Sequence, residues 1–329
     1  MGTGRIASNE STSPRIHESS NILLCAGLTP AWQQILVFDA FAAGQVNRAG
    51  QTLWTSSGKV FNAGIAAHHL GGPSMTLALA GGSILGEIEA ELTALGVPHR
   101  LVHTRTGTRI CTTIIDRAAA RVTELVENGR EVSGLELDAF RRAYVEEVAR
   151  AGVAVLSGSL PDGTPTTFYR DLLERTHCKA VLDFRGAELM SVLDLSPFVV
   201  KPNREELART VAAPMESETD LHAAMRSLNA RGAQWVVVTH GAGDVWLSGA
   251  RELYRLRPPG VETVVNPIGS GDALAAGIAW ATRAGHGIVE AVRLGIAAAG
   301  LNVTQLLPCR LDPAAVADWS RRVGVERVE

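Results

Sequence analysis

The strongest constraint on the fold is the alternation of short apolar runs with helical patterns along the chain. Apolar runs that end in glycine or polar residues include "NILLCAG", "SMTLALAGG", "GVAVLSGSLP", "CKAVLDF", "PFVVKPN" and "QWVVVTHG". Patterns with helical spacing lie between them, such as "ILGEIEAELTALGV" and "LELDAFRRAYVEEVARAG". This alternation predicts an α/β fold with a mostly parallel central sheet. Because ligands bind beyond the carboxyl ends of such strands, the polar residues that follow them are the first candidates for a site.

Two stretches, at about residues 34–56 and about residues 106–128, carry strand patterns without a helix of their own. The first contains "QILVFDAF" and "RAGQTLWT", and the second contains "TRICTTIIDRAAARVTELVE". We expect them to form together a small antiparallel sheet beside the main one. Such a sheet could close over a cleft as a lid, and an ordinary edge hairpin is the alternative.

Composition narrows the class of protein. The 329 residues carry 31 basic and 34 acidic side chains, a net charge of −3, which gives no sign of a nucleic-acid partner. No apolar run reaches the roughly 18 residues of a membrane span. Four widely spaced cysteines predict reduced thiols and a cytoplasmic protein. We expect a disordered tail at residues 1–20, which are polar and rich in serine, followed by one domain at residues 21–325.

The stretch "NPIGSGDALAAGIAW" places an acid where a glycine turn becomes a helix. The first backbone N–H groups of a helix have no internal partner, and the helix dipole there favours negative charge. Gly269, Ser270 and Gly271 could therefore hold a phosphoryl group, and Asp272 could accept a proton from an attacking hydroxyl. The alternative is that Asp272 only stabilises the first helical turn. Taken alone, the pattern favours this alternative, because glycine-acid helix starts are common.

Other motifs in a fixed order strengthen the first interpretation. The turn, with Ala276 and Gly277 after it, resembles the C-terminal signature of the ribokinase-like (PfkB) carbohydrate kinases. "SGSLP" at residues 157–161 and "KPNREEL" at residues 201–207 resemble further elements of that family. "GQVNR", "TRICTTIID" and "TELVENG" resemble its branch of 1-phosphofructokinase and tagatose-6-phosphate kinase. The resemblance runs from about Asn21 to about Leu311.

The resemblance implies a fold and a reaction. The fold is a three-layer α/β/α arrangement around a mostly parallel sheet, with a small β-sheet lid. In the reaction, a hydroxyl of a sugar or sugar phosphate attacks the γ-phosphate of ATP, with Mg²⁺ present. Asp272 would be the general base, and the backbone of Gly269, Ser270, Gly271 and Asp272 would form the anion hole.

The resemblance also assigns a nucleotide side to the site. The residues expected there are Lys201, Asn203, Glu206, Thr239, Gly241 and Asn302. Glu206 would hold Mg²⁺ through water, because this ion gives up its waters reluctantly. Asn302 would lie near the adenine, and an ordinary helix-surface position is the alternative for it.

On the acceptor side, the resemblance singles out Gln33, Arg48, Gly58, Lys59, Asn62, Arg109 and Ser159. Arg48, Lys59 and Arg109 would form a cationic cluster for the phosphate of a phosphosugar. The alternative is that the three are solvated charges of the lid.

Three departures from the family pattern affect mainly this acceptor side. Gln33 stands where the family has an acid that grips sugar hydroxyls, and an amide both donates and accepts hydrogen bonds. Val60 replaces a glycine and would narrow any close approach of the backbone. "LLPC" lacks the family's glycine after the proline.

These departures leave two alternatives to a sugar or sugar-phosphate kinase. One is a non-catalytic sugar or nucleotide sensor on a kinase scaffold. The other is a kinase for a nucleoside or another small alcohol. We also expect that the lid could pair with the lid of a second copy to form a homodimer.

Overall fold

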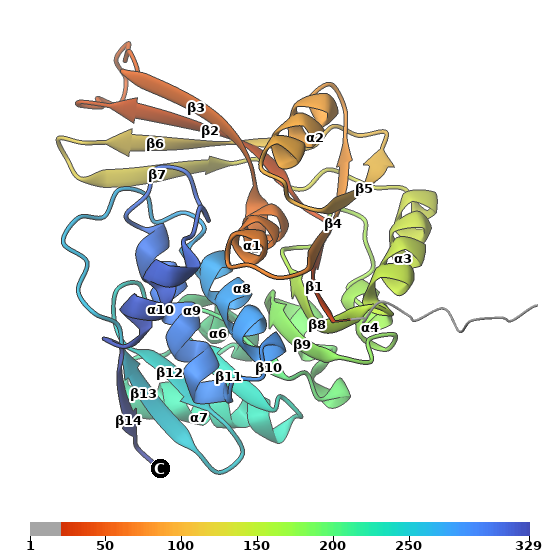
Figure 1. The fold of residues 1–329 in the computed structure, drawn as a ribbon, viewed down its shortest axis with the longest axis vertical. Helices are drawn as coiled ribbons and strands as arrows, with labels where there is room; N and C mark the ends of the chain where they lie inside the picture. Colours follow the sequence, from red (N-terminus) through yellow and green to blue (C-terminus); the bar gives the residue numbers. More distant parts are fainter. Residues whose placement is uncertain (1–20) are drawn as a thin grey trace, which may run out of the picture.

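The computed structural model describes residues 21–329, so the tail predicted at residues 1–20 lies outside the described residues. A ten-stranded sheet forms the centre of the molecule, in the order β14-β13-β12-β11-β10-β9-β8-β1-β4-β5 (Figure 1). Its parallel part comprises β1 (Ile22–Gly27), β4 (Ser74–Gly81), β5 (His99–Thr104), β8 (Ala151–Ser157), β9 (Lys179–Asp183), β10 (Val199–Val200) and β11 (Trp235–Val238). The antiparallel edge comprises β12 (Val245–Ser248), β13 (Leu253–Arg257) and β14 (Gly324–Arg327). The mostly parallel sheet is confirmed.

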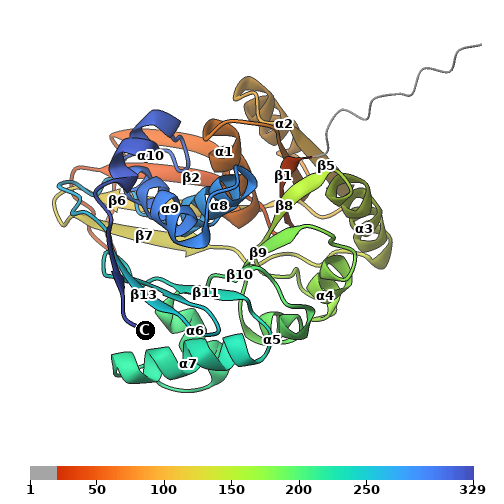
Figure 2. The ribbon, with the colours of Figure 1, turned by 60° about the horizontal axis from the view of Figure 1, so that its bottom comes forward.

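Helices cover both faces of this sheet (Figure 2). One face packs against α1 (Gly58–His69), α2 (Leu85–Ala94), α8 (Ser270–Arg283), α9 (Ile288–Asn302) and α10 (Pro313–Ser320). The other packs against α3 (Gly134–Val148), α4 (Phe168–Leu173), α5 (Gly186–Met190), α6 (Arg204–Val211) and α7 (Glu218–Ala230). Successive side chains of β1 enter the two cores in turn, because neighbouring residues of a strand point to opposite faces. The predicted three-layer arrangement is confirmed.

A separate four-stranded sheet has the order β3-β2-β6-β7. Its strands are β2 (Ala31–Phe38), β3 (Gln51–Ser57), β6 (Arg109–Asp116) and β7 (Arg121–Val126). The prediction of an antiparallel sheet was wrong for its central pair, because β2 and β6 are parallel. Each of them continues a parallel strand of the main sheet after a short connection, β2 after β1 and β6 after β5, so both enter the small sheet in the same direction.

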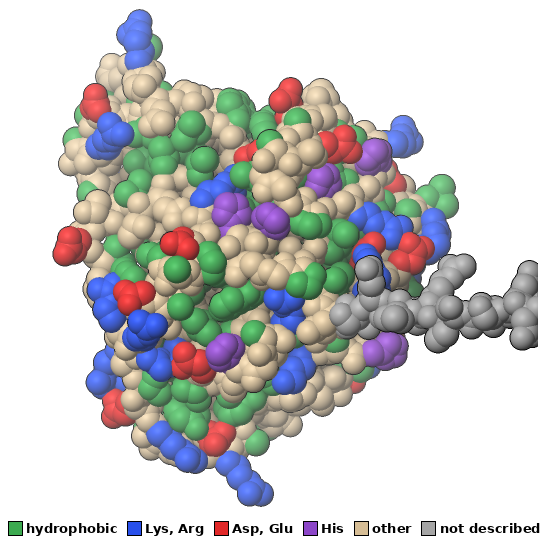
Figure 3. All heavy atoms as spheres, in the orientation of Figure 1, with side chains coloured by type: hydrophobic (Ala, Val, Ile, Leu, Met, Phe, Trp, Pro, Cys, Tyr) green, Lys and Arg blue, Asp and Glu red, His purple; other side chains and the backbone are tan. Residues whose placement is uncertain are grey.

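The faces of the small sheet differ in their surroundings. Ile35, Val37 and Ile115 are buried and contact Leu306 and Leu307 from the loop after α9. The intervening residues of β2 and β6 point to the opposite, outer face. Figure 3 shows hydrophobic side chains gathered over this sheet. Among residues 21–329, no helix is both long and apolar enough to cross a membrane.

Candidate active site

The glycine turn forms the start of α8, because Gly269 is its N-cap and the helix begins at Ser270, two residues earlier than expected. Gly269 has a φ of +83°, and a Cβ there would lie 2.8 Å from Cβ of Pro308, so the turn requires glycine for both reasons. Within residues 21–329, no acceptor takes the backbone N–H of Gly269, Gly271 or Asp272. The turn therefore presents three free donors at the positive end of the helix dipole.

Asp272 lies in the first turn of α8 with only 8% of its surface exposed. Its Oδ2 accepts a hydrogen bond of 2.8 Å from Nδ2 of Asn62, a residue in the first turns of α1. Burial and the nearby Asp183 carboxylate raise the pKa of Asp272 to about 6, against the opposing effect of Lys59 and Asn62. A carboxylate with this pKa is ionised at neutral pH and is a better proton acceptor than an ordinary aspartate.

A buried ion cluster lies next to Asp272. Asp183, at the end of β9, is 2.8 Å from Nζ of Lys59 and 3.2 Å from Nζ of Lys201. Burial alone would raise the pKa of Asp183, but the two ammonium groups outweigh it and hold the pKa below the usual value. Burial likewise opposes the charge of Lys59, yet Asp183, Glu206 and Asp272 together raise its pKa. The ammonium group of Lys59 is therefore kept charged near Asp272.

The Asn203 and Glu206 pair forms a reciprocal cap at the start of α6. Oδ1 of Asn203 accepts the N–H of Glu206, and Oε2 of Glu206 accepts the N–H of Asn203. The spacing that resembles a kinase motif is therefore also a capping box. Oε1 of Glu206 is not used in the cap, and it lies 3.2 Å from Arg185 and 3.6 Å from Lys59.

A cavity of about 360 Å³ connects several of these groups. It is lined by Thr29, Lys59, Arg109, Gly158, Ser159, Phe184, Arg185, Gly186, Glu188 and Glu206. The structure thus brings Lys59, Arg109 and Ser159, expected on the acceptor side, together with Glu206, expected on the nucleotide side. Lys201 does not line this cavity but lies beside the glycine turn, because a Cβ on Gly271 would be 3.5 Å from its Nζ.

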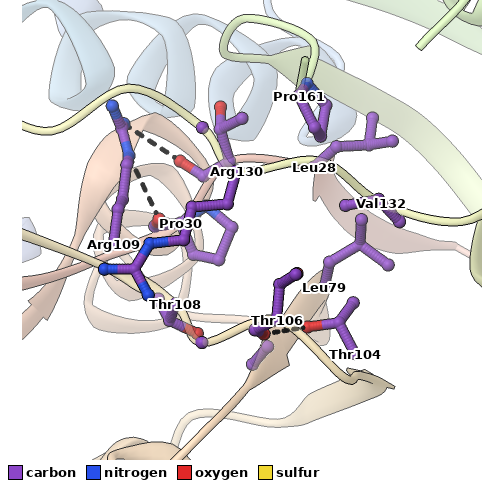
Figure 4. Close-up of a pocket in the computed structure, with 14 residues that line it drawn as sticks. Leu28, Pro30, Leu79, Thr104, Thr106, Thr108, Arg109, Arg130, Val132 and Pro161 are labelled. Atoms are coloured by element: carbon purple, nitrogen blue, oxygen red, sulfur yellow. Dashed lines mark hydrogen bonds between the residues drawn. The ribbon is translucent and has the colours of Figure 1, made fainter. Parts of the chain in front are cut away.

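Arg109 is held by the backbone rather than by an acid. Its guanidinium donates to the carbonyl oxygens of Thr29, Pro30 and Glu127 at 3.0–3.3 Å. The bond to Pro30 is drawn in Figure 4. Within the described chain, no carboxylate forms a salt bridge with it. The small hollow drawn in Figure 4, with a volume of about 30 Å³, adjoins the same side chain. Arg109 is therefore a fixed cation with donors to spare.

The structure does not place Arg48 or Gln33 on the cavity. Arg48 lies exposed in the connection between β2 and β3, so the expected cluster of Arg48, Lys59 and Arg109 does not form within one chain. Gln33 is buried in the small sheet, where its Nε2 donates to Oγ1 of Thr113 at 2.7 Å. Gly58 begins α1 with a φ of +79°, in close contact with the backbone of Ala31.

The expected nucleotide residues are divided. Thr239 forms a bridge to Asn203 after β11, and Gly241 lies exposed in the turn that follows. Asn302 is fully buried at the end of α9, and both ends of its amide are bonded inside the protein. This side chain therefore has no surface with which to contact the adenine expected near it, and it is not the ordinary helix-surface residue of the alternative either.

Asp183 and Arg185 were not singled out from the sequence. Asp183 carried a usable signal, because an acid ends the buried run "CKAVLDF" at the carboxyl edge of the sheet. Arg185 has a side chain that reaches Glu206, in another segment of the chain, and the sequence does not show that proximity.

Comparison with known proteins places the chain in a family. The model of the pfkB family carbohydrate kinases matches residues 24–314. The chain belongs to this family. It is a carbohydrate kinase, as the sequence motifs predicted.

Solved structures agree on the fold. A possible 1-phosphofructokinase from Thermotoga maritima superposes with a TM-score of 0.86 at 22% identity, covering 94% of this chain and all of that one (100%). Phosphofructokinase-2 from Escherichia coli, in complex with fructose-6-phosphate, gives a TM-score of 0.81 at 21% identity, covering 92% of this chain and 98% of that one. At such identities the likeness establishes the ribokinase-like fold.

Proposed function

We propose that this kinase transfers the γ-phosphate of ATP to a hydroxyl of a sugar phosphate or a sugar. The observation that carries the proposal is the position of Asp272, a buried carboxylate with a pKa of about 6 in the turn whose backbone donors are free. Within this turn, one group can accept a proton while its neighbours bind negative charge. That combination is what phosphoryl transfer to an alcohol requires.

In the proposed reaction, Asp272 accepts the proton of the acceptor hydroxyl. The hydroxyl oxygen of the acceptor bonds to the γ-phosphorus, and the bond between that phosphorus and the oxygen bridging to the β-phosphate breaks. The N–H groups of Gly269, Gly271 and Asp272 bind the charge on the transferring group. Lys201 and Lys59, which both pair with Asp183, add positive charge near the turn. ADP then leaves, and the acceptor carries the new phosphate.

Mg²⁺ fits the acids of the site in an indirect way. Within the described residues, no group of three or more metal-binding side chains is close enough to enclose an ion. Oδ2 of Asp183 is buried without a hydrogen-bond partner, and Oε1 of Glu206 faces the cavity. These two oxygens suit an ion that keeps its waters and takes most other ligands from phosphates, and such an ion would neutralise the charge of the triphosphate. Asn203, whose amide is used in the cap, would support Glu206 from behind.

The acceptor cavity favours an anionic group. Arg109 is a pinned cation without an acid partner, whereas Lys59 and Arg185 are each neutralised by carboxylates. A phosphate on the acceptor would find spare, correctly held donors on Arg109. Ser159 and Gly158 could bind its sugar hydroxyls. On the nucleotide side, Thr239 and Gly241 would border the ATP cleft.

We further propose a homodimer that forms through the outer face of the small sheet, and a cytoplasmic location that suits its four free thiols. Trp32 and Trp54 stack on that face with ring centroids 6.1 Å apart, and Trp54 is 42% exposed. Leu125, which shares the face, is 55% exposed. An apolar sheet face of this kind is usually covered, and sedimentation of the wild type against Trp54→Asp measures whether a second copy covers it.

The activity is tested by ADP release from Mg-ATP with a panel of ketose phosphates, free sugars and nucleosides, beside Asp272→Ala. We expect one class of acceptor to turn over and the variant to lose that turnover. Turnover of nucleosides alone would favour the alternative of a nucleoside kinase. Gln33 is compatible with this alternative, because its amide is bonded to Thr113 inside the small sheet and replaces the acid expected to grip sugar hydroxyls. Binding of ATP or a sugar without any turnover would contradict the proposal and indicate a sensor.

A further inference from the structure

A single side chain holds the peptide group that precedes the glycine turn. Nδ2 of Asn302, at the end of α9, donates a hydrogen bond of 2.9 Å to the carbonyl oxygen of Ile268. Its Oδ1 accepts the N–H of Cys309 at 2.6 Å. The side chain is 0% exposed, so its amide links two loops without contact with solvent.

The first consequence concerns the N–H of Gly269. In a planar trans peptide, the C=O and the N–H point in opposite directions, and all peptide bonds described here are trans. The bond from Asn302 to the Ile268 carbonyl therefore also fixes the direction of the Gly269 N–H. That N–H points away from Asn302 and has no acceptor within residues 21–329.

The second consequence concerns the N–H of Asp272. In an uninterrupted α-helix this group would bond to the carbonyl four residues earlier, which is that of Ile268. In the structure no such bond forms, and the Ile268 carbonyl is bonded to Asn302 instead. The helix begins after this carbonyl, and the N–H of Asp272 stays free.

The neighbouring hydrogen bonds leave the orientation of the peptide between Ile268 and Gly269 to the bond from Asn302. Asn266 accepts the N–H of Ile268 at 3.1 Å and donates to Leu306 at 2.9 Å, which anchors the segment before the turn. The Gly269 carbonyl is held by the N–H of Ala273 at 2.8 Å. Among residues 21–329, Asn302 alone donates to the Ile268 carbonyl, so it decides the orientation of the peptide between these two anchors.

We infer that Asn302 is a positioning residue for phosphoryl transfer, which keeps the N–H groups of Gly269 and Asp272 directed at the transferring phosphate. This inference rests on the proposed function of the turn. Without the amide, the Ile268 carbonyl is free to turn toward the helix and accept the Asp272 N–H. The N–H of Asp272 would then bond within the helix, and the N–H of Gly269 would no longer point at the transferring phosphate.

Asn302→Ala is compared with Asn229→Ala in steady-state kinetics, each rate being divided by the folded fraction from circular dichroism. Asn229 is the matched control, because its amide also bridges segments, from α7 to Ala233 and Ser248, away from the site. We expect Asn302→Ala to lower kcat by about 10- to 100-fold with little change in either KM, a size typical of residues that hold a functional group from behind. Asn229→Ala should leave kcat unchanged.

Asn302→Asp guards against a failure of the alanine variant to fold. Its carboxyl keeps the shape and the acceptor for Cys309, and it donates to Ile268 only when it is protonated. Its activity relative to wild type at the same pH should therefore rise toward acid pH and exceed that of Asn302→Ala there. Activity no higher than that of Asn302→Ala at every pH would overturn the inference.

Two other outcomes also overturn it. A raised KM for ATP at unchanged kcat would show that Asn302 acts on nucleotide binding. An effect on kcat no larger than that of Asn229→Ala would show a purely structural role. Absence of wild-type turnover with any acceptor would instead refute the proposed function itself, so the two failures are distinguishable.

Discussion

The ion cluster around Asp183 and Asp272 lies inside the core, whereas the small sheet exposes much of its surface. Asp183, Lys201 and Asp272 are each less than 10% exposed, and main-sheet strands or core helices fix their positions. By contrast, β7 is largely exposed and Arg48 lies on an open connection. The charged groups of the site are therefore held rigidly, whereas the layer that contributes Arg109 to the proposed acceptor cavity has fewer restraints.

The largest expected effect is on the rigid side, at Asp272. Asp272→Asn keeps the shape and the contact with Asn62 but removes the base, so kcat should fall by about 10²- to 10⁴-fold. The same change should stabilise the protein by roughly 1–3 kcal/mol at neutral pH, because the folded protein raises the pKa of this acid from 3.8 to about 6. Kinetics and urea unfolding measure both. Asp138→Asn, on the exposed face of α3, is the control. A lower free energy of unfolding for Asp272→Asn than for wild type would contradict the electrostatic argument.

The pH dependence follows from the same pKa. Asp272 acts as a base only when ionised, so kcat/KM should decline as the pH falls through about 6. The free energy of unfolding should change with pH in the opposite direction to kcat/KM. Because the pKa of Asp272 is raised in the folded protein, its protonated form stabilises the fold at low pH, and this contribution is lost as the pH rises from 3.8 to about 6. A rate profile without a limb near that pH would argue against Asp272 as the base.

Asp183→Asn tests the coupling within the cluster. It leaves Lys59 and Lys201 beside each other without their shared acid, which should destabilise the protein by about 3–5 kcal/mol. It also removes the neighbouring charge that raises the pKa of Asp272, so the acid limb of the rate profile should move to lower pH in whatever folds. Profiles of the variant and wild type decide this, and a limb that moves to higher pH would contradict the assigned cause.

The sequence alone predicted features that depend on local patterns, but not those that depend on contacts between distant segments. The main sheet and the Asp272 turn were predictable because hydrophobic periodicity and a glycine before an acid are local signals. The parallel pairing of β2 with β6 was not, because it depends on where each strand leaves the main sheet. Neither position considered for Asn302, near the adenine or on a helix surface, includes its full burial, because burial of a polar residue depends on its partners, here Ile268 and Cys309. Arg185 was missed because its proximity to Glu206, in another segment of the chain, is not visible in the sequence.

On the acceptor side, Arg109→Lys should have a smaller and more selective effect. Lysine keeps the charge but cannot make the three backbone bonds and still offer a fork to a phosphate. We expect the KM of a phosphorylated acceptor to rise by about 10-fold, which corresponds to 1.4 kcal/mol, with little change for an unphosphorylated one. Arg130→Lys is the control, because Arg130 lines only the small hollow and pairs with Glu127. Equal effects on phosphorylated and unphosphorylated acceptors would show that Arg109 does not recognise the acceptor phosphate.

The smallest effect is expected at Gln33, one of the three departures of the sequence from the family pattern. Gln33→Asp restores the acid but shortens the side chain, and the hydroxyl of Thr113 would then donate to the carboxylate instead of accepting from the amide. Because the position is only 2% exposed, we expect a loss of about 1–3 kcal/mol in stability and a change of only a few-fold in acceptor preference. Gln34→Asp, on the outer face of the same strand, controls for the added charge. A large gain of activity toward free sugars in Gln33→Asp alone would show that the small sheet opens this residue to the acceptor, and that the less restrained layer sets specificity more strongly than its contacts here indicate.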